Sequence, residues 1–348
     1  MPNSRSNGHS GPPGPAATIS AIAAEIGVSV PTVSKVLNGR ADVAPDTRAR
    51  VEEALARHRY KRRPRRTAAP GPPLVDLVFH EMDSAWSIEI IRGVGTAAAA
   101  AGVGVVLSEL GGEHHPRQEW LDAVLARRPQ GVILVLSTLA PEQQHQLESR
   151  SIPFVVVDTL GELPTGVPTV GSNNWGGGLA ATRHLLGLGH RRIAVISGQE
   201  DVLCSRARID GFRSAHDEAG ERVDPSLIRH GDFSVDGGYR HGKDLLARPD
   251  RPTAVFAGND MQALGVLRAA RELGLDVPRD LSVVGYDDLP LAGWTGPALT
   301  TVDQQLRTMA GTATTMVLAL ARGDDPPLRR IELATELVVR ESTAPPRE

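Results

Sequence analysis

The stretch from Thr18 to Tyr60 constrains the fold most, because it contains two short amphipathic helices separated by a glycine. Thr18 can cap the first helix through its hydroxyl. Four apolar residues then recur at helical spacing and make one face: Ile19, Ile22, Ala23 and Ile26. Gly27 can adopt the left-handed conformation that ends this helix and turns the chain. The pattern is typical of a helix-turn-helix, which lays its second helix in the major groove of DNA.

The second helix of this stretch is expected to have one apolar and one polar side. Ser29 can cap it, and Pro31 lies in its first turn, where the missing N–H costs nothing. The inward residues are Val33, Val36 and Leu37, and the outward residues are Thr32, Ser34, Lys35 and Asn38. We expect a third helix from Pro45, with Asp46 near its positive end. Its apolar residues close the small core: Val51, Ala54 and Leu55.

Charge is distributed unevenly along the 348 residues. Residues 1–69 contain 12 lysines and arginines against 5 aspartates and glutamates, whereas the remainder contains 26 against 36. A basic head on an acidic body suits a phosphate-binding module joined to a regulatory domain. It also disfavours the alternative that the two helices are an ordinary hairpin within a larger fold.

The rest of the composition disfavours several classes of protein. The single cysteine, Cys204, excludes a disulfide framework. No apolar run approaches the length of a membrane helix. Residues 1–17 are polar and rich in glycine and proline, without the hydrophobic stretch of a signal peptide. We therefore expect a disordered tail at 1–17 and a cytoplasmic protein without membrane contact.

Two further segments follow the helical head. Residues 61–73, KRRPRRTAAPGPP, form a basic linker or hinge in which proline and glycine break helices. From 74 to 348, short apolar strands alternate with helical segments, which predicts an α/β body with parallel sheets covered on both faces. The strands fall into two sets, which begin with LVDLVF and RIAVISG respectively. We therefore expect two doubly wound lobes and a ligand cleft at the carboxyl ends of their strands.

The string GVSVPTVSKVLNG, followed by TR and then Tyr60, resembles the lactose-repressor (LacI/GalR) family of bacterial transcription regulators. Similar strings cover nearly the whole chain, including LGHRRIAVISG, SRARIDGF, TAVFAGND, LSVVGYDD and PALTTV. The resemblance implies a three-helix helix-turn-helix domain at 18–60 and a two-lobed periplasmic-binding-protein-like body at 74–348. It also implies three crossover segments between the lobes, near Val170–Asn174, Asp288–Trp294 and Arg322–Leu328.

The resemblance assigns DNA contacts to particular residues. In that family, the residues after the turn serine and the basic residue of the motif reach base edges, and here these are Val30, Pro31 and Lys35. Thr32, Ser34 and Asn38 match positions that hold phosphates, which set register while base contacts set sequence. Because Val30 and Pro31 lack strong hydrogen-bonding groups, we expect readout to depend on Lys35 and on apolar contact with thymine methyls.

Polar residues at strand ends are candidates for ligand binding. Arg208 matches the family arginine that holds the ligand, and its planar fork can bond two neighbouring hydroxyls. Carboxylates and amides at strand ends are acceptors for sugar hydroxyls, and the resemblance favours Asn259 over Asp260 and Asp287 over Asp288. Asp158, at the end of a strand in the first lobe, completes the set of candidate acceptors.

Aromatic residues make up only 3% of the chain, so those in loops are informative. Trp86 and Phe233 are candidates for packing on the apolar face of a sugar ring, with ordinary core packing as the alternative. His80 and Ser84, beside Trp86, are further candidates. Trp175 and Trp294 lie near expected crossovers and suit hinge packing instead.

The chain departs from the family pattern in two places. Pro64 displaces the motif of the usual hinge helix and Ala69 stands where its leucine would be, so we expect no wedge helix in the minor groove. We expect the linker arginines instead to lie along phosphates or in a narrow minor groove, with steep salt dependence and weak operator bending. These are Arg62, Arg63, Arg65 and Arg66. Asn173 stands where the family more often has aspartate, which predicts a changed ligand charge preference.

Several motif-like patterns do not indicate chemistry. Gly237 to Lys243 fits G-x-x-x-x-G-K, but Asp244 follows it and the segment has the pattern of a helix interior. Gly93–Val94–Gly95 also falls inside an expected helix. The histidines His80, His114 and His115 lack metal-ligand spacing, and no base is placed to activate Cys204. We therefore expect no enzyme, cofactor or metal site.

These features predict a homodimeric regulator that binds a pseudo-palindromic, double-stranded DNA operator and a small-molecule effector, most simply a sugar. Two alternatives stay open. A purine or other corepressor would tighten DNA binding, although Asp158, Asp287 and the scarce aromatics favour a polyol over a planar base. A cytosolic sugar-binding protein or enzyme would use the same body without DNA, but the missing signal sequence and catalytic set disfavour it.

Overall fold

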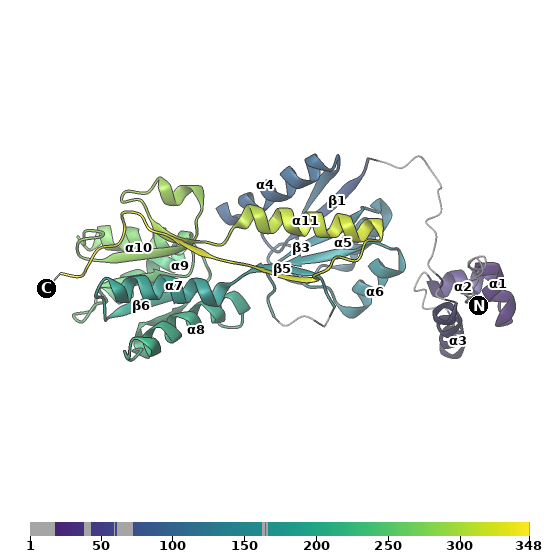
Figure 1. Ribbon diagram of the computed structural model, residues 1–348, viewed down its shortest axis with the longest axis horizontal. Coiled ribbons are helices and arrows are strands. Elements are labelled where there is room, and N and C mark those ends of the chain that lie inside the picture. The colour runs from purple at the N-terminus through teal and green to yellow at the C-terminus, as the bar shows by residue number, and fades with distance from the viewer. Residues whose placement is uncertain are drawn as a thin grey trace, which may run out of the picture. The chain divides into compact units, whose positions relative to one another are not determined.

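A computed structural model describes residues 18–37, 43–58, 60, 72–161, 164 and 166–347. The chain divides into two compact units, one of residues 1–71 with 144–150 and the other of 72–143 with 151–348 (Figure 1). Each is described by itself. The expected disordered tail, Asn38 and the four linker arginines lie outside the described residues.

The first unit contains the three expected helices: α1 (Ile19–Glu25), α2 (Val30–Leu37) and α3 (Pro45–Arg57). The Thr18 hydroxyl caps α1 by accepting from the Ala21 N–H at 3.2 Å, and the Ser29 hydroxyl accepts from the Thr32 N–H at 3.2 Å at the start of α2. Gly27 has a φ of +66° in the turn. The chain bends by 110° between α1 and α2, within the range of helix-turn-helix motifs.

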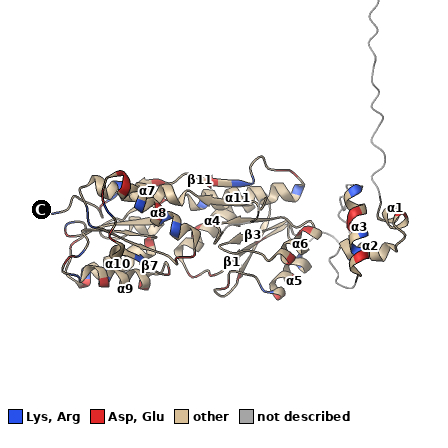
Figure 2. Ribbon diagram, turned by 90° about the horizontal axis from the view of Figure 1, so that it is seen from below, with Lys and Arg blue, Asp and Glu red and all other residues tan. Residues whose placement is uncertain are grey.

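A small apolar core holds these three helices together. Its fully buried members are Ile22, Val33, Val51 and Ala54. Polar contacts join α3 to the end of α1, because Arg50 donates to the Ile26 carbonyl and Arg57 pairs with Glu25 at 2.8 Å. The Arg57 pair is half-exposed, so each such contact adds little to stability and the apolar core decides the packing. Basic and acidic residues both occur along α3 (Figure 2).

The second unit is the expected pair of doubly wound lobes. The first lobe has a six-stranded sheet in the order β11-β5-β4-β3-β1-β2, with every neighbouring pair parallel. Its strands are β1 (Leu74–Phe79), β2 (Gly104–Glu109), β3 (Gly131–Val135), β4 (Phe154–Val157), β5 (Thr169–Ser172) and β11 (Arg330–Leu333). Its helices are α4 (Ala85–Ala100), α5 (Gln118–Arg127) and α11 (Leu306–Arg322). Between β3 and β4 the chain forms α6 (Pro141–Ser149), whose residues from 144 onward are grouped with the first unit.

The second lobe repeats this design with the order β12-β10-β9-β8-β6-β7, in which only β12 is antiparallel to its neighbour. Its strands are β6 (Ile193–Ser197), β7 (Ile228–His230), β8 (Ala254–Ala257), β9 (Ser282–Asp287), β10 (Thr300–Asp303) and β12 (Glu336–Val338). Its helices are α7 (Asn174–Gly187), α8 (Leu203–Glu218), α9 (Val235–Leu246) and α10 (Asp260–Glu272), with short turns η1 (Pro225–Leu227) and η2 (Pro290–Gly293).

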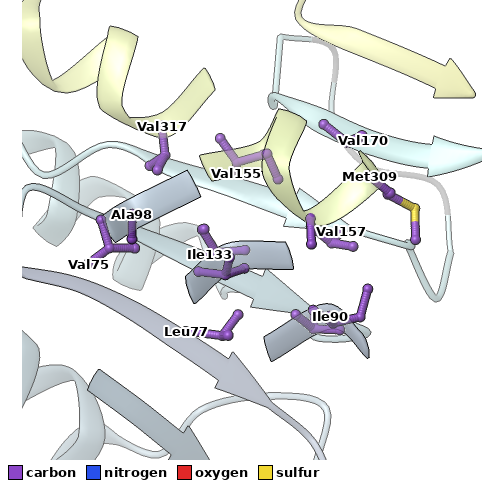
Figure 3. Close-up of a cluster of buried hydrophobic side chains, with 14 of the residues drawn as sticks. Val75, Leu77, Ile90, Ala98, Ile133, Val155, Val157, Val170, Met309 and Val317 are labelled. Atoms are coloured by element: carbon purple, nitrogen blue, oxygen red, sulfur yellow. The ribbon is translucent and has the colours of Figure 1, made fainter. Parts of the chain in front are cut away.

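Continuous apolar strands follow from burial on both faces of each sheet. In β8, Val255 packs with the residues of α9 and α10, whereas Phe256 packs with those of α7 and α8. In the first lobe, residues from β1, β3, β4 and β5 meet α4 and α11 in one cluster (Figure 3). This packing fixes the strand ends, and the loops that follow them therefore have defined positions.

Glycines in the helices allow close contact between them. A Cβ on Gly178 of α7 would lie 2.2 Å from the Arg208 carbonyl of α8, and one on Gly238 of α9 would lie 2.2 Å from the Gln262 carbonyl of α10. The G-x-x-x-x-G-K pattern thus lies inside α9, as expected, and its Gly238 and Gly242 pack against α10. Gly93 likewise faces Arg307 and Ala310 of α11 inside α4.

Three segments connect the lobes, and two of them differ from expectation. The first runs from β5 to α7 through Asn173, as expected. The second runs from Asp303 to Leu306, and the third joins β11 to β12 through Ala334 and Thr335. The expected crossovers at Asp288–Trp294 and Arg322–Leu328 were therefore wrong. Both are turns within one lobe. After the first turn, β10 pairs with β9 in the second lobe, and after the second turn, β11 pairs with β5 in the first lobe, so the chain crosses only after these strands.

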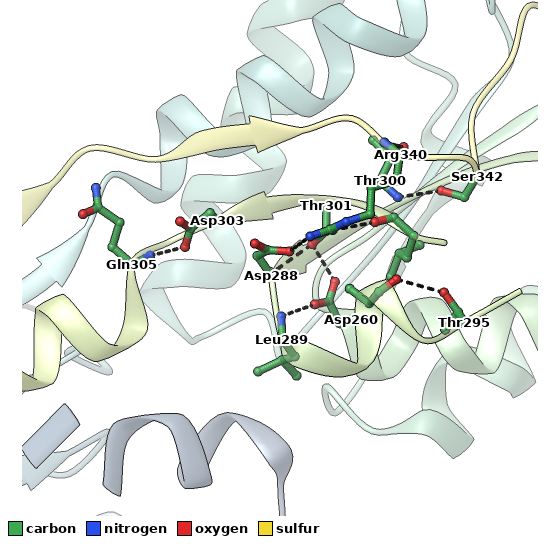
Figure 4. Close-up of polar contacts among 12 residues, drawn as sticks. Asp260, Asp288, Leu289, Thr295, Thr300, Thr301, Asp303, Gln305, Arg340 and Ser342 are labelled. Carbon is green, nitrogen blue, oxygen red and sulfur yellow. Dashed lines mark hydrogen bonds and ion pairs between the residues drawn. The ribbon is translucent and has the colours of Figure 1, made fainter. Parts of the chain in front are cut away.

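Polar contacts hold the crossing segments together. The Asn173 N–H donates to the Leu333 carbonyl at 2.8 Å, and Gln305 donates through its side chain to the Ala334 carbonyl at 2.9 Å. Beside them, Asp288 pairs with Arg340, and Asp260 accepts from the Thr301 hydroxyl and the Leu289 N–H (Figure 4). In the described part of the chain, no single helix is long and apolar enough to cross a membrane. Only α1 and α2 together, across their bend, reach that length and composition.

Candidate ligand cavity and nucleic-acid surface

The outer side of α2 is the candidate nucleic-acid surface. Val30, Pro31 and Lys35 are exposed there, and Val30 shows 43% of its surface although it is apolar. Thr32 and Ser34 are half-buried, and the Thr32 hydroxyl lies 2.8 Å from that of Ser29. The structure thus places the five described candidates along one short helix, and their contacts with bases and phosphates stay predictions.

A cavity of about 510 Å³ lies between the two lobes of the body. Its walls come from loops at the carboxyl ends of β1 to β4 in one lobe and of β6 to β9 in the other, as parallel sheets favour. All six residues proposed from sequence for ligand binding line it: Trp86, Asp158, Arg208, Phe233, Asn259 and Asp287. His80 and Ser84 line it as well.

Arg208 occupies the most constrained position in the cavity. It projects from the first half of α8 and is only 3% exposed. Its Nε donates to the Asn174 side-chain oxygen at 2.9 Å, and a terminal nitrogen donates to the Gly258 carbonyl. The guanidinium carbon lies 3.7 Å from the centre of the Tyr286 ring, a cation–π contact. Held in this way, the guanidinium keeps further N–H groups for a ligand.

Two buried carboxylates, one from each lobe, experience the positive charge of the Arg208 guanidinium. Asp158 follows β4, and Asp287 ends β9. Burial raises the pKa of Asp158 to about 6, although Arg208 opposes the shift. Burial also raises the pKa of Asp287 well above its ordinary value, against Arg208 and together with the neighbouring Asp260. The side chain of Gln304 donates a hydrogen bond to Asp287. Both carboxyls are acceptors whose protonation depends on what fills the cavity.

The raised pKa of Asp158 predicts that Asp158→Asn stabilises the ligand-free protein. The unfolded carboxyl ionises near its ordinary pKa of about 3.9, so the folded state favours the protonated form up to about pH 6. Ionised Asp158 therefore lowers the free energy of unfolding by an amount that grows between the unfolded pKa and the folded pKa and is constant at higher pH. We expect a gain of about 1–3 kcal/mol in the free energy of unfolding at pH 7.5 and almost none at pH 4.

Urea unfolding of the ligand-free protein at both pH values measures this gain. Asp122→Asn, at an exposed site on α5, is the matched control and should change little at either pH. A gain at pH 4 that equals or exceeds the gain at pH 7.5 would contradict the assignment of a buried, ionised Asp158.

The two candidate aromatic residues lie on opposite lobes. Phe233 follows β7, and its carbonyl accepts from the Asn259 amide at 2.9 Å, while the Asn259 oxygen caps α10 by accepting from the Gln262 N–H. A Cβ on Gly198 would lie 2.0 Å from the Phe233 ring, so glycine lets this ring approach the sheet. Trp86 is half-buried near the start of α4, and it also packs against the core of the first lobe.

Backbone conformation distinguishes this cavity from the rest of the body. Four of its lining residues other than glycine have positive φ values: Leu136, Asp158, Phe233 and Asp287, at +48°, +48°, +60° and +111°. Such conformations cost of order 1–3 kcal/mol each and concentrate where function demands a particular side-chain direction. Sequence reasoning has no access to this signal.

Some lining residues were not proposed from sequence. Glu81 and Asp83 lie in the loop after β1, His114 follows β2, and Asp232 precedes Phe233. The rings of His80 and His114 stack with centres 4.8 Å apart. Burial, and then His114, lower the pKa of His80, which is therefore uncharged at neutral pH. The rule that ligands bind after strand ends would have included all of these loops.

Other candidates have structural roles. Asn173 does not line the cavity: its side-chain oxygen caps α7 by accepting from the Gly176 N–H at 2.8 Å. The expected effect of Asn173 on ligand charge therefore has no contact with the cavity to support it and stays a prediction. Trp294 does not pack in a hinge, since 82% of it is exposed. Cys204 lines the cavity, but burial raises the pKa of its thiol to about 11, so it stays protonated. Among the described residues, no three His, Cys, Asp or Glu side chains are grouped to hold a metal ion.

Known proteins match both parts of this chain. Residues 18–63 match the family described as bacterial regulatory proteins, lacI family, and residues 182–343 match the periplasmic binding protein-like domain. The chain is 35% identical to the HTH-type transcriptional regulator MalR of Streptomyces coelicolor over 332 residues, which cover 93% of this chain and 95% of MalR. It is 34% identical to the HTH-type transcriptional repressor PurR of Erwinia tasmaniensis over 331 residues, 94% of this chain and 97% of PurR.

A solved structure is similar to this chain over nearly its whole length. The transcriptional regulator CelR–cellobiose complex superposes on this chain with a TM-score of 0.68 and 33% sequence identity, and the match covers 94% of this chain and 99% of that one. The matches to MalR, PurR and CelR all span the head and the body together, so the two units described above occur in one chain in those regulators.

Proposed function

The chain belongs to the LacI family of bacterial regulatory proteins, and we propose that it is a transcriptional repressor controlled by a sugar bound between its lobes. The observation that carries this proposal is the cavity, whose acceptors and aromatic faces come from both lobes. A ligand that bridges the lobes favours one angle between them. It changes operator affinity only if it binds the two DNA-binding states with different affinities.

The exposed side of α2 supports the proposed DNA contacts. We assign base contact to Lys35, Val30 and Pro31, and phosphate contact to Thr32, Ser34 and Asn38. A lysine ammonium donates well to guanine O6 and N7 in the major groove, whereas Val30 offers an apolar surface to a thymine methyl. Because each half-site receives only one cation and few apolar contacts, we expect the protein to recognise few base pairs of its operator.

A sugar suits the cavity better than other small molecules. Arg208 offers donors, Asp158 and Asp287 offer acceptors, and Phe233 and Trp86 offer apolar faces. Sugar hydroxyls pair with the first two groups and the ring C–H face packs on the third. The related CelR structure contains cellobiose. We propose binding without chemical change to the sugar, in a protein that works in the cytoplasm, where its operator is.

The basic linker is proposed to follow DNA phosphates. Each phosphate contact lowers the slope of log affinity against log salt concentration by about 0.9. Replacing Arg62, Arg63, Arg65 and Arg66 by alanine in both subunits should therefore flatten that slope by up to about 7. Gel-shift titrations at several potassium chloride concentrations measure it. Alanine at four exposed body arginines, Arg183, Arg213, Arg268 and Arg322, is the matched control.

Two results would contradict this view of the linker. One is an unchanged slope in the variant. The other is an operator bend, measured by gel phasing, as large as that produced by regulators with a formed wedge helix.

We propose that the protein is a homodimer that places one head on each half of a pseudo-palindromic operator. Ile88 and Trp294 are exposed apolar side chains of the body, with 49% and 82% of their surface exposed. Burial against a second subunit would account for such residues. Sedimentation equilibrium should give twice the 37.0 kDa of one chain, and a mass of one chain would exclude the dimer.

The proposed function is tested by a screen followed by a DNA assay. A thermal-shift panel of mono- and disaccharides, with hypoxanthine and guanine included, identifies ligands of the wild-type protein. Each hit is then added to a gel shift on the promoter fragment next to the gene. A sugar that shifts both the melting temperature and the operator affinity supports the proposal, whereas a purine that does so replaces the sugar.

A further inference from the structure

The cavity has a strong excess of negative charge. Its acidic lining residues are Glu81, Asp83, Asp158, Asp232 and Asp287, against the single cation Arg208. No lysine lines it among the described residues, and His80 is uncharged at neutral pH because burial lowers its pKa. A charged ligand would therefore experience this excess from both lobes.

Three of the acidic groups lie at the exposed rim of the cavity. Within the described residues, no hydrogen bond or ion pair engages the exposed carboxylates of Glu81 and Asp83. Asp232 is exposed and pairs with Arg240 at 3.4 Å. Desolvation raises its pKa, but hydrogen bonds from the Ser234 N–H and hydroxyl, with the charge of Arg240, hold that pKa below its ordinary value. These three lie in the loops after β1 and β7, in different lobes.

Arg208 does not offset this charge. It shares the cavity with Asp158 and Asp287, whose pKa values its charge lowers against burial, and two of its N–H groups are held by Asn174 and Gly258. A phosphate or carboxylate placed on Arg208 would therefore meet these two aspartates as well. Neutral hydroxyls, in contrast, can donate to the aspartates while they accept from Arg208.

Helix N-termini would also attract an anion. Those of α4, α8, α9 and α10 open at the cavity, and each carries about half a positive charge. Side chains of Ser84, Ser234 and Asn259 cap α4, α9 and α10, whereas no side chain caps α8. Together the four termini amount to roughly two positive charges, fewer than the negative excess of the lining side chains even if Asp287 is protonated.

Building on the function proposed above, we propose that the cavity selects uncharged sugars and rejects phosphorylated sugars and sugar acids. The selection rests on Glu81 and Asp83 in the first lobe and on Asp232 in the second. A metal ion that bridges these carboxylates to an anion is disfavoured, because the described residues offer no group of three metal ligands.

Matched pairs of probes test the selection on the full-length wild-type protein. The pairs are glucose with glucose 6-phosphate, glucose with gluconate, and cellobiose with cellobionate, each measured by thermal shift and by calorimetric titration at pH 7.5. We expect the neutral member of a binding pair to bind at least about 100-fold more tightly, because like charges placed together oppose binding strongly. An acidic member that binds equally or more tightly overturns the proposal, and so does the absence of any neutral ligand.

A variant that lacks two of the cavity carboxylates distinguishes electrostatic selection from steric exclusion of the larger, acidic ligand. Glu81→Gln combined with Asp83→Asn should reduce the discrimination at least about 10-fold, by improving binding of the acidic member. Glu119→Gln combined with Asp122→Asn removes the same charge from the exposed side of α5 in the same lobe and should leave discrimination unchanged. Equal effects of the two double variants would show that the loop after β1 has no special role, and would overturn that assignment.

Failure here differs from failure of the proposed function. If a phosphorylated sugar binds and also changes operator affinity, charge selection is wrong while sugar-controlled regulation stands. If no sugar of either kind changes operator affinity, the proposed function fails irrespective of which sugars bind.

Discussion

Arg208→Ala is expected to abolish the response to the sugar while DNA binding without sugar stays within about threefold of wild type. The guanidinium is 3% exposed and lies beside Asp158 and Asp287 in the cavity. Hydrogen bonds to a charged group contribute about 1.5–3 kcal/mol each, so loss of two weakens ligand affinity by roughly 100-fold or more. Removal also leaves the two aspartates without their shared counter-charge, which raises their pKa values further.

Two companion variants make this result interpretable. Arg208→Lys keeps the charge but loses the planar fork, so we expect a folded protein with an intermediate loss of ligand affinity. Arg183→Ala removes an exposed arginine on α7 that pairs with Glu218, and it should behave as wild type. If a folded Arg208→Ala protein, with a normal circular dichroism spectrum, still binds the sugar with unchanged affinity, Arg208 is not a ligand-binding residue.

Lys35→Ala is expected to have the opposite effect. The variant loses operator binding, but the sugar still shifts its melting temperature. A good base contact contributes about 1–3 kcal/mol of discrimination, and a dimer makes it twice. The combined loss of about 2–6 kcal/mol corresponds to a 30-fold to 10⁴-fold weaker operator complex. Binding to random-sequence DNA should weaken far less, because only one charge per subunit is removed.

Arg57→Ala is the matched control in the head, because it removes one exposed cation from α3 rather than α2. Lys35→Arg keeps the charge and should retain part of the operator affinity. An equal loss for operator and random-sequence DNA in Lys35→Ala would show that Lys35 contacts only phosphates. No loss on either DNA would remove it from the interface.

Local sequence signals were sufficient for the elements that depend on periodicity. The helix-turn-helix was predictable because apolar residues recur at helical spacing on each side of Gly27, and the structure buries one from each helix: Ile22, Val33 and Val51. The two doubly wound lobes were predictable because their strands are short, continuous apolar runs, which only a sheet covered on both faces requires. These patterns need no knowledge of distant contacts.

The candidate cavity was predictable for a similar reason. Parallel strands bring their carboxyl ends to one edge of a sheet, so Asn259 and Asp287 had to lie near each other once the second sheet was assigned. Asp158 belongs to the other sheet and reaches the same cavity because the two lobes face each other. Which of Asn259 and Asp260, and which of Asp287 and Asp288, faces the cavity came from the family resemblance. The structure places Asp260 and Asp288 in contacts with Thr301 and Arg340 instead.

Features that depend on long-range packing were not predictable. The crossovers at Asp303–Leu306 and Ala334–Thr335 were missed because the Pro- and Gly-rich segments 288–294 and 322–328 carry the same turn signals as a true crossover. Asn174 supports Arg208 only because α7 and α8 pack closely at Gly178 and Gly211. Asn173, adjacent to it, proved to be a helix cap, and the two roles look identical in the sequence.

The central claim is that one chain couples a sugar site to an operator site, and a reciprocal titration tests it most directly. Fluorescence anisotropy gives the affinity of the wild-type protein for labelled operator with and without the sugar found by thermal shift, and calorimetry gives its affinity for that sugar with and without operator. We predict that the sugar changes operator affinity at least about 10-fold and that operator changes sugar affinity by the same factor, as linkage requires. Two affinities that are each unaffected by the other ligand, or no binding to any promoter fragment at low ionic strength, would contradict the account.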